Sequence, residues 1–501
     1  MLRRDFGKAS LGLFGSTFLT SSTESARAAT CADFPHGTGI THSVSQFVTQ
    51  TNYNDIPPEV IEVGKKSILD GLGLALAGSR KEMGFISRRY VRSLGIENGR
   101  AVIAGSAEKT VPPFAALLNG ISIHADDFDD TQLASEKNRV YGLLTHPTVS
   151  VLSAILALLH PEKISGKDFM LAYHLGVEVE CKIAEAISPR SYEDGFHSTG
   201  TCGPFGSAAA CAKLRRFNFS QILTLLGLVA SQSAGLRENF GTMTKPFHAG
   251  HAAQIGVMSA GLVALGWTAS QQILEADAGF FHAYGGSYEP EIILNRLGKP
   301  WTFVSPGVSL KPFPSGSLTH PAMTELMRLI KENNIEAPQV ARVDVGANRY
   351  MTTTLLHHHP KTGLEAKFSM EFCIAILLLE RKAGLREFTD DVVNRPDVQA
   401  MIHTVNFYVD PVADDAGYNK MTSLLKIHLK NGRVITGQAQ FAKGSPSNPM
   451  SFEETAEKFR GCTEFAEWPT DKSEKIIGFV KELETVPDAS AIVSLLSNEN
   501  A

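Results

Sequence analysis

The sequence predicts a mainly α-helical protein in which a smaller α+β domain is inserted ahead of the last helices. Between about residues 55 and 298, apolar positions recur at helical spacing. From about residue 305 the pattern alternates as it does in strands, and after about residue 449 it is helical again. The expected units are an all-helical domain over residues 40–304, an α+β domain over 305–446, and C-terminal helices over 447–501 that return to the helical domain.

Several local signals place the expected helices of the first domain. Pro57-Pro58 opens a stretch with helical periodicity, and proline is favoured in the first turn of a helix. Residues 149–160 are apolar nearly all round, which indicates a buried central helix. Ser165 is an expected N-cap, and Thr268 is expected to form a capping box with Gln271.

The signals for strands gather in the second domain. The segments "ARVDVGA" and "TVNFYVD" alternate between apolar and polar residues. In "LLKIHLKNGRVITGQ" two such runs are joined by Asn431-Gly432, a strong hairpin signal. A helix over residues 369–382 is expected between these strands.

Composition excludes several classes of protein. The chain has 501 residues, which suggests two domains, and 43% of them are hydrophobic, as in ordinary globular proteins. The net charge of −5 argues against nucleic acid as a partner. The six cysteines form no Cys-x-x-Cys pair, so neither a zinc cluster nor a disulfide framework is expected. Because no glycine-rich phosphate loop follows a strand, a nucleotide-binding fold is not indicated either.

The first 28 residues have the features of a processed export leader. They combine a basic start with an apolar centre too short to span a membrane, and they end in Ala26-Arg27-Ala28. Arg3-Arg4, followed by Phe6 and Lys8, matches a bacterial twin-arginine signal, although a chance basic start is the alternative. The leader predicts a periplasmic or otherwise exported protein that meets the membrane only during export and whose mature chain begins near Ala29.

Candidate chemical groups gather in four loop segments. The first is "HADDFDDT", which is followed, after a long polar loop over 132–144, by "THPTVSV". The others are "GFHSTGTCGPFGSAAA", "RENFGTMTKPFHAGHAA" and "VSLKPFPSGSLTHPA". These segments are expected in loops between helices, and the fourth lies at the expected domain junction.

These groups also have purely structural interpretations. Asp126, Asp129 and Asp130 can serve as caps and turn formers, and His197 can be a loop histidine bonded to backbone. The lysines next to prolines can be surface residues. A metal at "HADDFDD" needs converging ligands, and no second ligand cluster is present, so no metal is expected. The adjacent histidines 357–359 are expected at a solvated strand end.

Taken together and in this order, "HADDFDDT…THPTVSV", "GFHSTGTCGPFGSAAA", "GTMTKPFHAGHAAQIGVMSAGL" and "LKPFPSGSLTHPA" resemble the MmgE/PrpD family from about Ser43 to the C-terminus. The family includes 2-methylcitrate dehydratase, cis-aconitate decarboxylase and an iminodisuccinate epimerase. The resemblance implies a helical domain with a smaller lid domain, an active site between them, a homodimer, and no metal or organic cofactor.

The resemblance also assigns candidate roles to residues. Those expected to be catalytic are Asp127, His146 and His197. Those expected to bind substrate are Thr131, Lys245, Lys311 and Tyr350. Arg237 is added to them because an anionic substrate needs cationic anchors. Tyr350 is the nearest match to a tyrosine of the decarboxylases. Two departures concern the substrate: the 132–144 loop is longer than expected, and Ser315-Gly316 stands where relatives often have cysteines.

The expected reaction is proton transfer next to a carboxylate of a di- or tricarboxylate. A histidine titrates near neutral pH, so His197 is the first choice for the acid or base, with Asp127 as the second member. Lysines suit the anchoring of carboxylates and the stabilisation of developing negative charge. The leading hypothesis is a cofactor-independent dehydratase or decarboxylase. An epimerase using the same groups and an exported carboxylate-binding protein are the alternatives.

Overall fold

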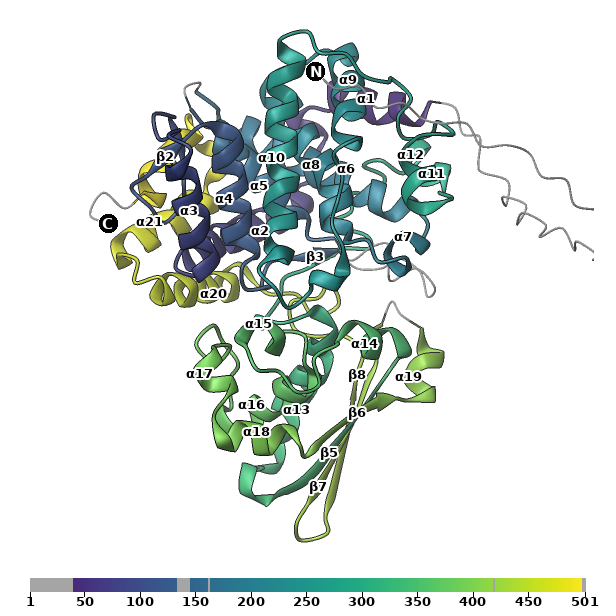
Figure 1. Ribbon diagram of the computed structural model, residues 1–501, viewed down its shortest axis with the longest axis vertical. Coiled ribbons are helices and arrows are strands. Elements are labelled where there is room, and N and C mark those ends of the chain that lie inside the picture. The colour runs from purple at the N-terminus through teal and green to yellow at the C-terminus, as the bar shows by residue number, and fades with distance from the viewer. Residues whose placement is uncertain (1–38, 133–144, 161–162, 418–419, 498–501) are drawn as a thin grey trace, which may run out of the picture. The chain divides into compact units, whose positions relative to one another are not determined.

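The computed structural model describes residues 39–132, 145–160, 163–417 and 420–497 (Figure 1). The expected leader and most of the polar 132–144 loop lie outside the described residues. Helices dominate, and the only extensive sheet in the described chain is small, which confirms the mainly α class. Among the described helices, none is long and apolar enough to cross a membrane.

The helical domain is built from long helices around an apolar core. They are α1 (Ile40–Gln50), α2 (Pro58–Gly78), α3 (Glu82–Ser93), α4 (Pro112–His124), α5 (Pro147–Leu158), α6 (Gly166–Ala186), α8 (Ser198–Leu214), α9 (Phe219–Ala230) and α10 (Thr244–Ala264). Helix α5 is buried from Pro147 to Ala157, as its apolar sequence predicts, and it packs between α4, α6, α8 and α10. Short helices α7 (Arg190–Glu193), α11 (Phe280–Gly285) and α12 (Pro290–Leu294) complete this part.

Helices of the helical domain approach closely where small residues meet. Helix α10 packs along α4 and α8 (Figure 1). A Cβ atom added at Gly250 of α10 would lie 2.3 Å from the carbonyl oxygen of Leu117, and one at Gly120 of α4 would lie 2.5 Å from Cα of Gly250. These two glycines therefore let the backbones of α4 and α10 touch, which sets the distance between the ends of both helices.

Two expected helix caps have different outcomes. The Ser165 hydroxyl accepts a hydrogen bond from the Asp168 amide at the start of α6, so this N-cap is confirmed. The capping box at Thr268 and Gln271 is wrong, because residues 267–279 form turns and no helix begins there. Instead, the Leu274 side chain is fully buried and its amide donates to the Thr41 hydroxyl of α1, so a tertiary contact replaces the local helix.

Residues 305–446, which we call the α+β domain, have a core of their own. Four strands form one sheet in the order β6-β5-β7-β8: β5 (Val340–Ala347), β6 (Val405–Val409), β7 (Ser423–Leu429) and β8 (Val434–Ala439). The β7–β8 hairpin is antiparallel and turns at Gly432, whose φ of 86° suits glycine, so the Asn431-Gly432 prediction is confirmed. Strand β6 runs parallel to β5.

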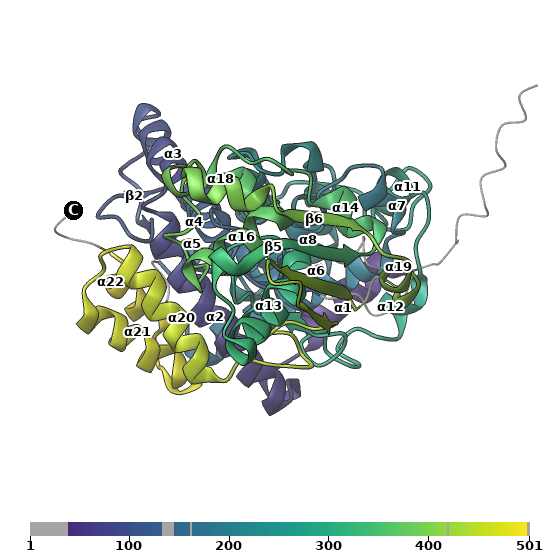
Figure 2. The same ribbon diagram turned by 90° about the horizontal axis from the view of Figure 1, so that it is seen from below.

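The helices of the α+β domain are α13 (His320–Asn333), α14 (Arg349–Thr354), α15 (Gly363–Ala366), α16 (Met370–Glu380), α17 (Asp390–Val393), α18 (Pro396–Ile402) and α19 (Pro411–Ala416). Helix α16 confirms the one expected over 369–382, with Ser369 as its N-cap. Helices α13, α16 and α18 lie beside the sheet (Figure 2).

The chain returns to the helical domain after the sheet. Helices α20 (Phe452–Phe465) and α21 (Thr470–Lys481) pack on α2, and α22 (Ile492–Leu496) packs on α21 (Figure 2). Two-residue strands β1 (Ala101–Val102) and β2 (Lys109–Thr110) pair with each other. Strands β3 (Thr131–Gln132) and β4 (Val308–Ser309) also pair, and this ladder joins the loop after α4 to the start of the α+β domain.

Candidate active site

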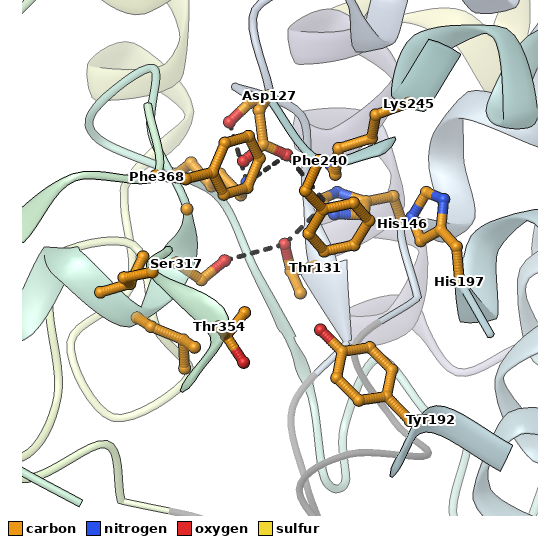
Figure 3. A pocket seen from close by; sticks show the side chains of 14 residues that line it. Asp127, Thr131, His146, Tyr192, His197, Phe240, Lys245, Ser317, Thr354 and Phe368 are labelled. Atoms are coloured by element: carbon orange, nitrogen blue, oxygen red, sulfur yellow. Dashed lines mark hydrogen bonds and ion pairs between the residues drawn. The ribbon is translucent and has the colours of Figure 1, made fainter. Parts of the chain in front are cut away.

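One pocket collects residues from distant parts of the chain (Figure 3). Together with the open solvent at its mouth, it has about 400 Å³ of space not filled by atoms. Six of the residues expected from the sequence line it: Asp127, Thr131, His146, His197, Lys245 and Lys311. The α+β domain contributes Lys311, Ser317, Thr354 and Phe368, so both domains build the wall.

Helix ends position most of these side chains. Asp127 lies three residues beyond the end of α4, with a left-handed φ of 48°. His146 and His197 are the N-cap residues of α5 and α8, and Lys245 is the second residue of α10. Because α4, α5, α8 and α10 pack against one another, these helix ends converge on one point.

The Asp127 carboxylate lies between two ammonium groups. Its Oδ1 atom is 2.6 Å from Lys245 Nζ and 3.0 Å from Lys311 Nζ. Lys311 also donates to the backbone carbonyls of Asp127 and Ser315, at 2.8 and 3.2 Å. Burial alone would raise the pKa of Asp127, but Lys245 and Lys311 hold the pKa well below its usual value. Asp127 is therefore an anion that fixes both lysines.

His124 has a defined tautomer. Lys245 Nζ lies 2.7 Å from His124 Nε2, and an ammonium group can only donate, so Nε2 must accept. The proton of the neutral ring is then on Nδ1, which donates to Asp129 at 2.8 Å. Burial lowers the pKa of His124 and keeps the ring neutral, although Asp129 opposes the effect. His124 thus links Asp129 to Lys245.

His146 lies between two carboxylates and a hydroxyl. Its Nε2 is 3.6 Å from Asp127 Oδ1, and its Nδ1 is 3.5 Å from both Asp129 Oδ1 and the Thr131 hydroxyl. Burial lowers the pKa of His146 to about 3, against the opposing effect of Asp129. The ring is therefore a neutral hydrogen-bonding group at neutral pH. Thr131 in turn is 3.1 Å from the hydroxyl of Ser317, in the α+β domain (Figure 3).

His197 has one unused nitrogen. Its Nδ1 lies 3.1 Å from Nδ1 of His248, whereas its Nε2 is buried and has no hydrogen-bond partner in the described chain. Burial, followed by the nearby Lys245 ammonium group, lowers the pKa of His197 well below its usual value. A buried polar atom without a hydrogen-bond partner is unfavourable unless a ligand bonds to it. Nε2 is therefore the atom of the site that is free to bond to the substrate.

The remaining candidates lie differently. Arg237 does not line the pocket; its guanidinium group stacks 4.1 Å from the ring centroid of Tyr192, which does line it. Tyr350, on α14, is not among the lining residues. The pocket therefore contains a tyrosine, but it is Tyr192, five residues before His197.

Three aspartates that were expected to shape the loop have separate roles. Asp126 pairs with Lys81 and with Lys367 of the α+β domain, both at 3.0 Å. Asp130 accepts from the amide and hydroxyl of Thr148 in α5. Asp129 accepts a hydrogen bond from His124 Nδ1, so it belongs to the site as well as to the loop.

Four side chains are close enough to hold a metal ion: His124, Asp127, Asp129 and His146, with donor atoms within 4.8 Å of one another. No metal is expected here from the sequence. Asp127 Oδ1 and His124 Nε2 already face the ammonium group of Lys245, and a divalent cation at these atoms would meet two positive neighbours. The donor set therefore fits a metal poorly while both lysines are charged.

The histidines at 357–359 do not converge. His357 faces the carbonyl of Phe240, His358 bonds to Glu371 at 2.7 Å, and His359 lies against His403. They follow helix α14 in an irregular segment and not a strand, so that part of the prediction is wrong, whereas His358 and His359 are exposed to solvent as expected.

Several residues of the site were not among the expected candidates. His124 and Asp129 belong to "HADDFDDT", and Ser317 belongs to "LKPFPSGSLTHPA", so the motifs contained the signal. Phe240 lies within "RENFGTMTKPFHAGHAA" but was not expected to contribute, and Phe368 lies in none of the four segments. Their rings lie 5.1 and 5.5 Å from Lys245 Nζ, where aromatic faces stabilise a buried cation.

Buried imidazoles, carboxylates and ammonium groups around one pocket are typical of an enzyme that moves protons beside an anionic substrate. Comparison with known proteins gives the family. The MmgE/PrpD N-terminal domain matches residues 42–293 and the MmgE/PrpD C-terminal domain matches residues 313–484. The chain belongs to the MmgE/PrpD family, as its motifs indicated.

Three relatives are similar over nearly their whole length. Human cis-aconitate decarboxylase is 28% identical over 468 residues, which cover 91% of this chain and 94% of the relative. The mouse cis-aconitate decarboxylase is 27% identical, covering 91% and 93%. The cis-aconitate decarboxylase of Aspergillus terreus is 26% identical, covering 93% and 97%. Decarboxylases are lyases, and the comparisons support this class for the chain.

Proposed function

We propose that this protein is a cofactor-independent lyase that decarboxylates a small polycarboxylate, with cis-aconitate as the first substrate to test. One observation carries the proposal: two buried ammonium groups, on Lys245 and Lys311, converge in the pocket where His197 has an unpaired nitrogen. The arrangement combines a cationic anchor with a proton donor or acceptor. The cis-aconitate decarboxylases among the relatives support the choice of reaction.

In the proposed mechanism, carboxylates of the substrate bind near Lys245 and Lys311, and the hydroxyls of Thr131 and Ser317 donate hydrogen bonds to them. The bond from carbon to the departing carboxylate breaks, and CO₂ leaves. The electron pair stays on the carbon framework, where the lysines stabilise its negative charge through a neighbouring carboxylate. A proton from His197 Nε2 forms the new C–H bond, so each turnover consumes one proton.

Two other outcomes use the same groups. Dehydration needs a proton for a leaving hydroxyl, and epimerisation returns a proton to the carbon that lost it. A carboxylate-binding protein would need the lysines but not the acid or base. The relatives' names favour decarboxylation, and the products decide among these reactions.

The test is to incubate the protein lacking residues 1–28 with cis-aconitate, 2-methylcitrate or citrate in D₂O and to follow the products by NMR. The expected result is CO₂ release with one new C–D bond in the product. Loss of water, or deuterium uptake without loss of carbon, would replace the proposal by a dehydratase or an epimerase. Tight binding with no turnover would contradict an enzymatic function.

Matched lysine variants test the anchor. Lys245→Met removes an ammonium group that contacts Asp127, and it should abolish measurable turnover. Lys331→Met changes an exposed lysine of α13 and should leave turnover unchanged. If both variants keep normal activity, Lys245 does not anchor the substrate.

We also propose that the protein acts outside the cytoplasm and forms a homodimer. The twin-arginine pattern at Arg3-Arg4 is the basis for export, and the family resemblance is the basis for the homodimer. Light scattering of the purified mature protein tests the dimer: twice the chain mass is expected, and a single-chain mass at micromolar concentration would contradict it.

A further inference from the structure

The buried histidine pair at the back of the pocket suggests a route for the proton. We propose that His248 is a positioning residue that relays protons from outside the pocket to His197, and this rests on the proposed function because decarboxylation consumes a proton. His248 lies on α10, one turn after Lys245, and its Nδ1 is 3.1 Å from Nδ1 of His197.

The geometry of the pair links the two tautomers. A short contact between two Nδ1 atoms requires a proton on one of them and a lone pair on the other. Burial and Lys245 lower the pKa of both His197 and His248, that of His248 to about 4, so both rings are neutral at neutral pH. When His197 carries its proton on Nε2, its Nδ1 accepts from Nδ1–H of His248. His248 Nε2 then has a free lone pair.

Exposure increases outward along the pair. His197 is 1% exposed and lines the pocket, whereas His248 is 8% exposed and is not among the lining residues. Nε2 of His248 has no hydrogen-bond partner in the described chain. In contrast to Nε2 of His197, it is not fully buried. The outer nitrogen can therefore meet water that does not pass through the pocket.

A relay through His248 would avoid the formation of an imidazolate at His197. A neutral imidazole that gives away its Nε2 proton would become imidazolate, a strong base and an unfavourable product. If His248 Nδ1–H moves to His197 Nδ1 as the Nε2 proton leaves, and water protonates His248 Nε2, both rings stay neutral. One proton moves from solvent to substrate carbon, and the two tautomers exchange. Proton exchange with water after product release restores the starting state.

The surroundings favour concerted transfer over a stored charge. Lys245 and His124, together with His251 one turn further along α10, all disfavour a positive charge on His248. Lys245, His248, His124 and His146 act in the same direction on His197. Neither ring is thus a stable imidazolium, so a proton must pass through the pair rather than rest on it.

Two glycines, Gly235 and Gly200, leave room for the His248 side chain. A Cβ added at Gly235 would lie 3.1 Å from Cγ of His248, and one at Gly200 would lie 3.3 Å from Cβ of His248. The carbonyl of Gly235 accepts a hydrogen bond from the His197 amide at 3.0 Å. The same glycine therefore holds the backbone of one histidine and makes room for the side chain of the other.

The kinetic test compares His248→Asn with His251→Asn. Asparagine places an amide near the position of Nδ1 and can keep a hydrogen bond to His197, but it cannot relay a proton. His251 lies on the same helix and bonds to Gln254, not to His197, so it is the matched control. The expected result for His248→Asn is a kcat at least tenfold lower with KM little changed, while His251→Asn behaves as the wild type.

Two further measurements separate a relay from mere support. The rate in mixtures of H₂O and D₂O should depend on isotope content in a curved way for the wild type and linearly for His248→Asn. Free imidazole should restore part of the activity of His248→Ala, which also shows that this variant folds. A wild-type kcat in His248→Asn, or an inactive His248→Ala that imidazole does not rescue, would overturn the proposal.

A spectroscopic test needs no substrate. With ¹⁵N-labelled histidine, the wild type should show a downfield N–H signal for the proton shared by the pair. The signal should vanish in His248→Ala and in His197→Ala but persist in His251→Asn. Its absence from the wild type would overturn the relay. Its presence in a protein that turns over no polycarboxylate would instead contradict the proposed function.

Discussion

At the scale of single residues, the carboxylate of Asp127 determines how the charges of the site are arranged. It contacts the ammonium groups of Lys245 and Lys311, and each lysine then reaches a second partner, His124 Nε2 or the backbone. Because His124 accepts from Lys245, it must donate to Asp129. The contacts of this one carboxylate thus determine which neighbouring atoms donate and which accept hydrogen bonds. His197 Nε2 remains available to the substrate.

His197→Asn tests whether the free Nε2 atom of His197 takes part in turnover. The substitution removes Nε2 but keeps the backbone hydrogen bond from residue 197 to Gly235. Positioned acids and bases contribute about 10²–10⁴-fold, so turnover should fall by about that factor while the thermal unfolding midpoint changes little. Steady-state kinetics and a melting curve on the same sample check both parts. Near-normal turnover on the true substrate would remove His197 from the mechanism.

The pH dependence of activity should report Lys311. Burial lowers its pKa to about 8, against the opposing effect of Asp127. A lysine is charged below its pKa, so the anchor is complete at pH 7 and is lost as the pH rises through about 8. We expect kcat/KM, which reports groups of the free enzyme, to fall above pH 8. A profile that stays flat to pH 10 would contradict a role for the Lys311 charge.

Removal of metal ions should leave activity unchanged. His124, Asp127, Asp129 and His146 could converge on an ion, but Lys245 already meets two of the donor atoms that it would use. We therefore expect full turnover after dialysis against excess EDTA. Loss of activity that one divalent metal restores would mean that a metal displaces the lysine contacts.

The motifs predicted much of the site because its polar residues cluster in the sequence. Asp127, Thr131, His146, His197, Lys245 and Lys311 all line one pocket. Tyr192 lies just before the quoted segment that holds His197, and only the fold shows that α7 brings it to the wall. Likewise, His248 looks like one of two similar histidines on α10 until the 3.1 Å contact with His197 distinguishes it from His251.

At the scale of elements, the crossing of α4 and α10 controls the distance between Asp127 and Lys245. The end of α4 leads to Asp127, and the start of α10 holds Lys245. Gly120 and Gly250 allow the two backbones to touch between these ends. Both glycines are visible in the sequence, but the sequence does not show which partner helix each one meets.

Gly250→Ala and Gly261→Ala form a matched pair on α10. At Gly250 the new methyl group would lie 2.3 Å from the carbonyl of Leu117, so the helices must separate. We expect a loss of about 1–3 kcal/mol in the free energy of unfolding, together with reduced turnover. At Gly261 nothing lies within 4 Å, and alanine should stabilise the helix by up to about 1 kcal/mol. Urea unfolding of both variants checks this, and equal effects would contradict it.

Element prediction failed where tertiary contacts replaced local signals. The Thr268 pattern has the residues of a capping box, but the buried Leu274 and its bond to Thr41 hold the segment in turns. By contrast, the Ser165 cap and the Asn431-Gly432 hairpin depend on neighbouring residues alone, and both are confirmed. Local chemistry therefore determines caps and turns only when no distant partner competes.

At the scale of the whole molecule, the candidate site needs both domains. Lys311 and Ser317 come from the α+β domain and contact Asp127 and Thr131 of the helical domain. The Asp126–Lys367 ion pair and the β3–β4 ladder join the same two regions. Separations of 184 to 241 residues along the chain carry no local signal of proximity, so only the family resemblance anticipated a site between domains.

The twin-arginine pattern makes a prediction about where the whole protein works. This export route carries folded proteins, which would suit a chain whose site is assembled from distant segments. With Arg3→Lys and Arg4→Lys together, the precursor should remain in the cytoplasm of a bacterial host with residues 1–28 attached. The unaltered chain should appear in the periplasm with an N-terminus near Ala29. Cell fractionation and mass spectrometry of the N-terminal peptide measure both, and export of the double variant, or retention of the unaltered precursor, would contradict the assignment.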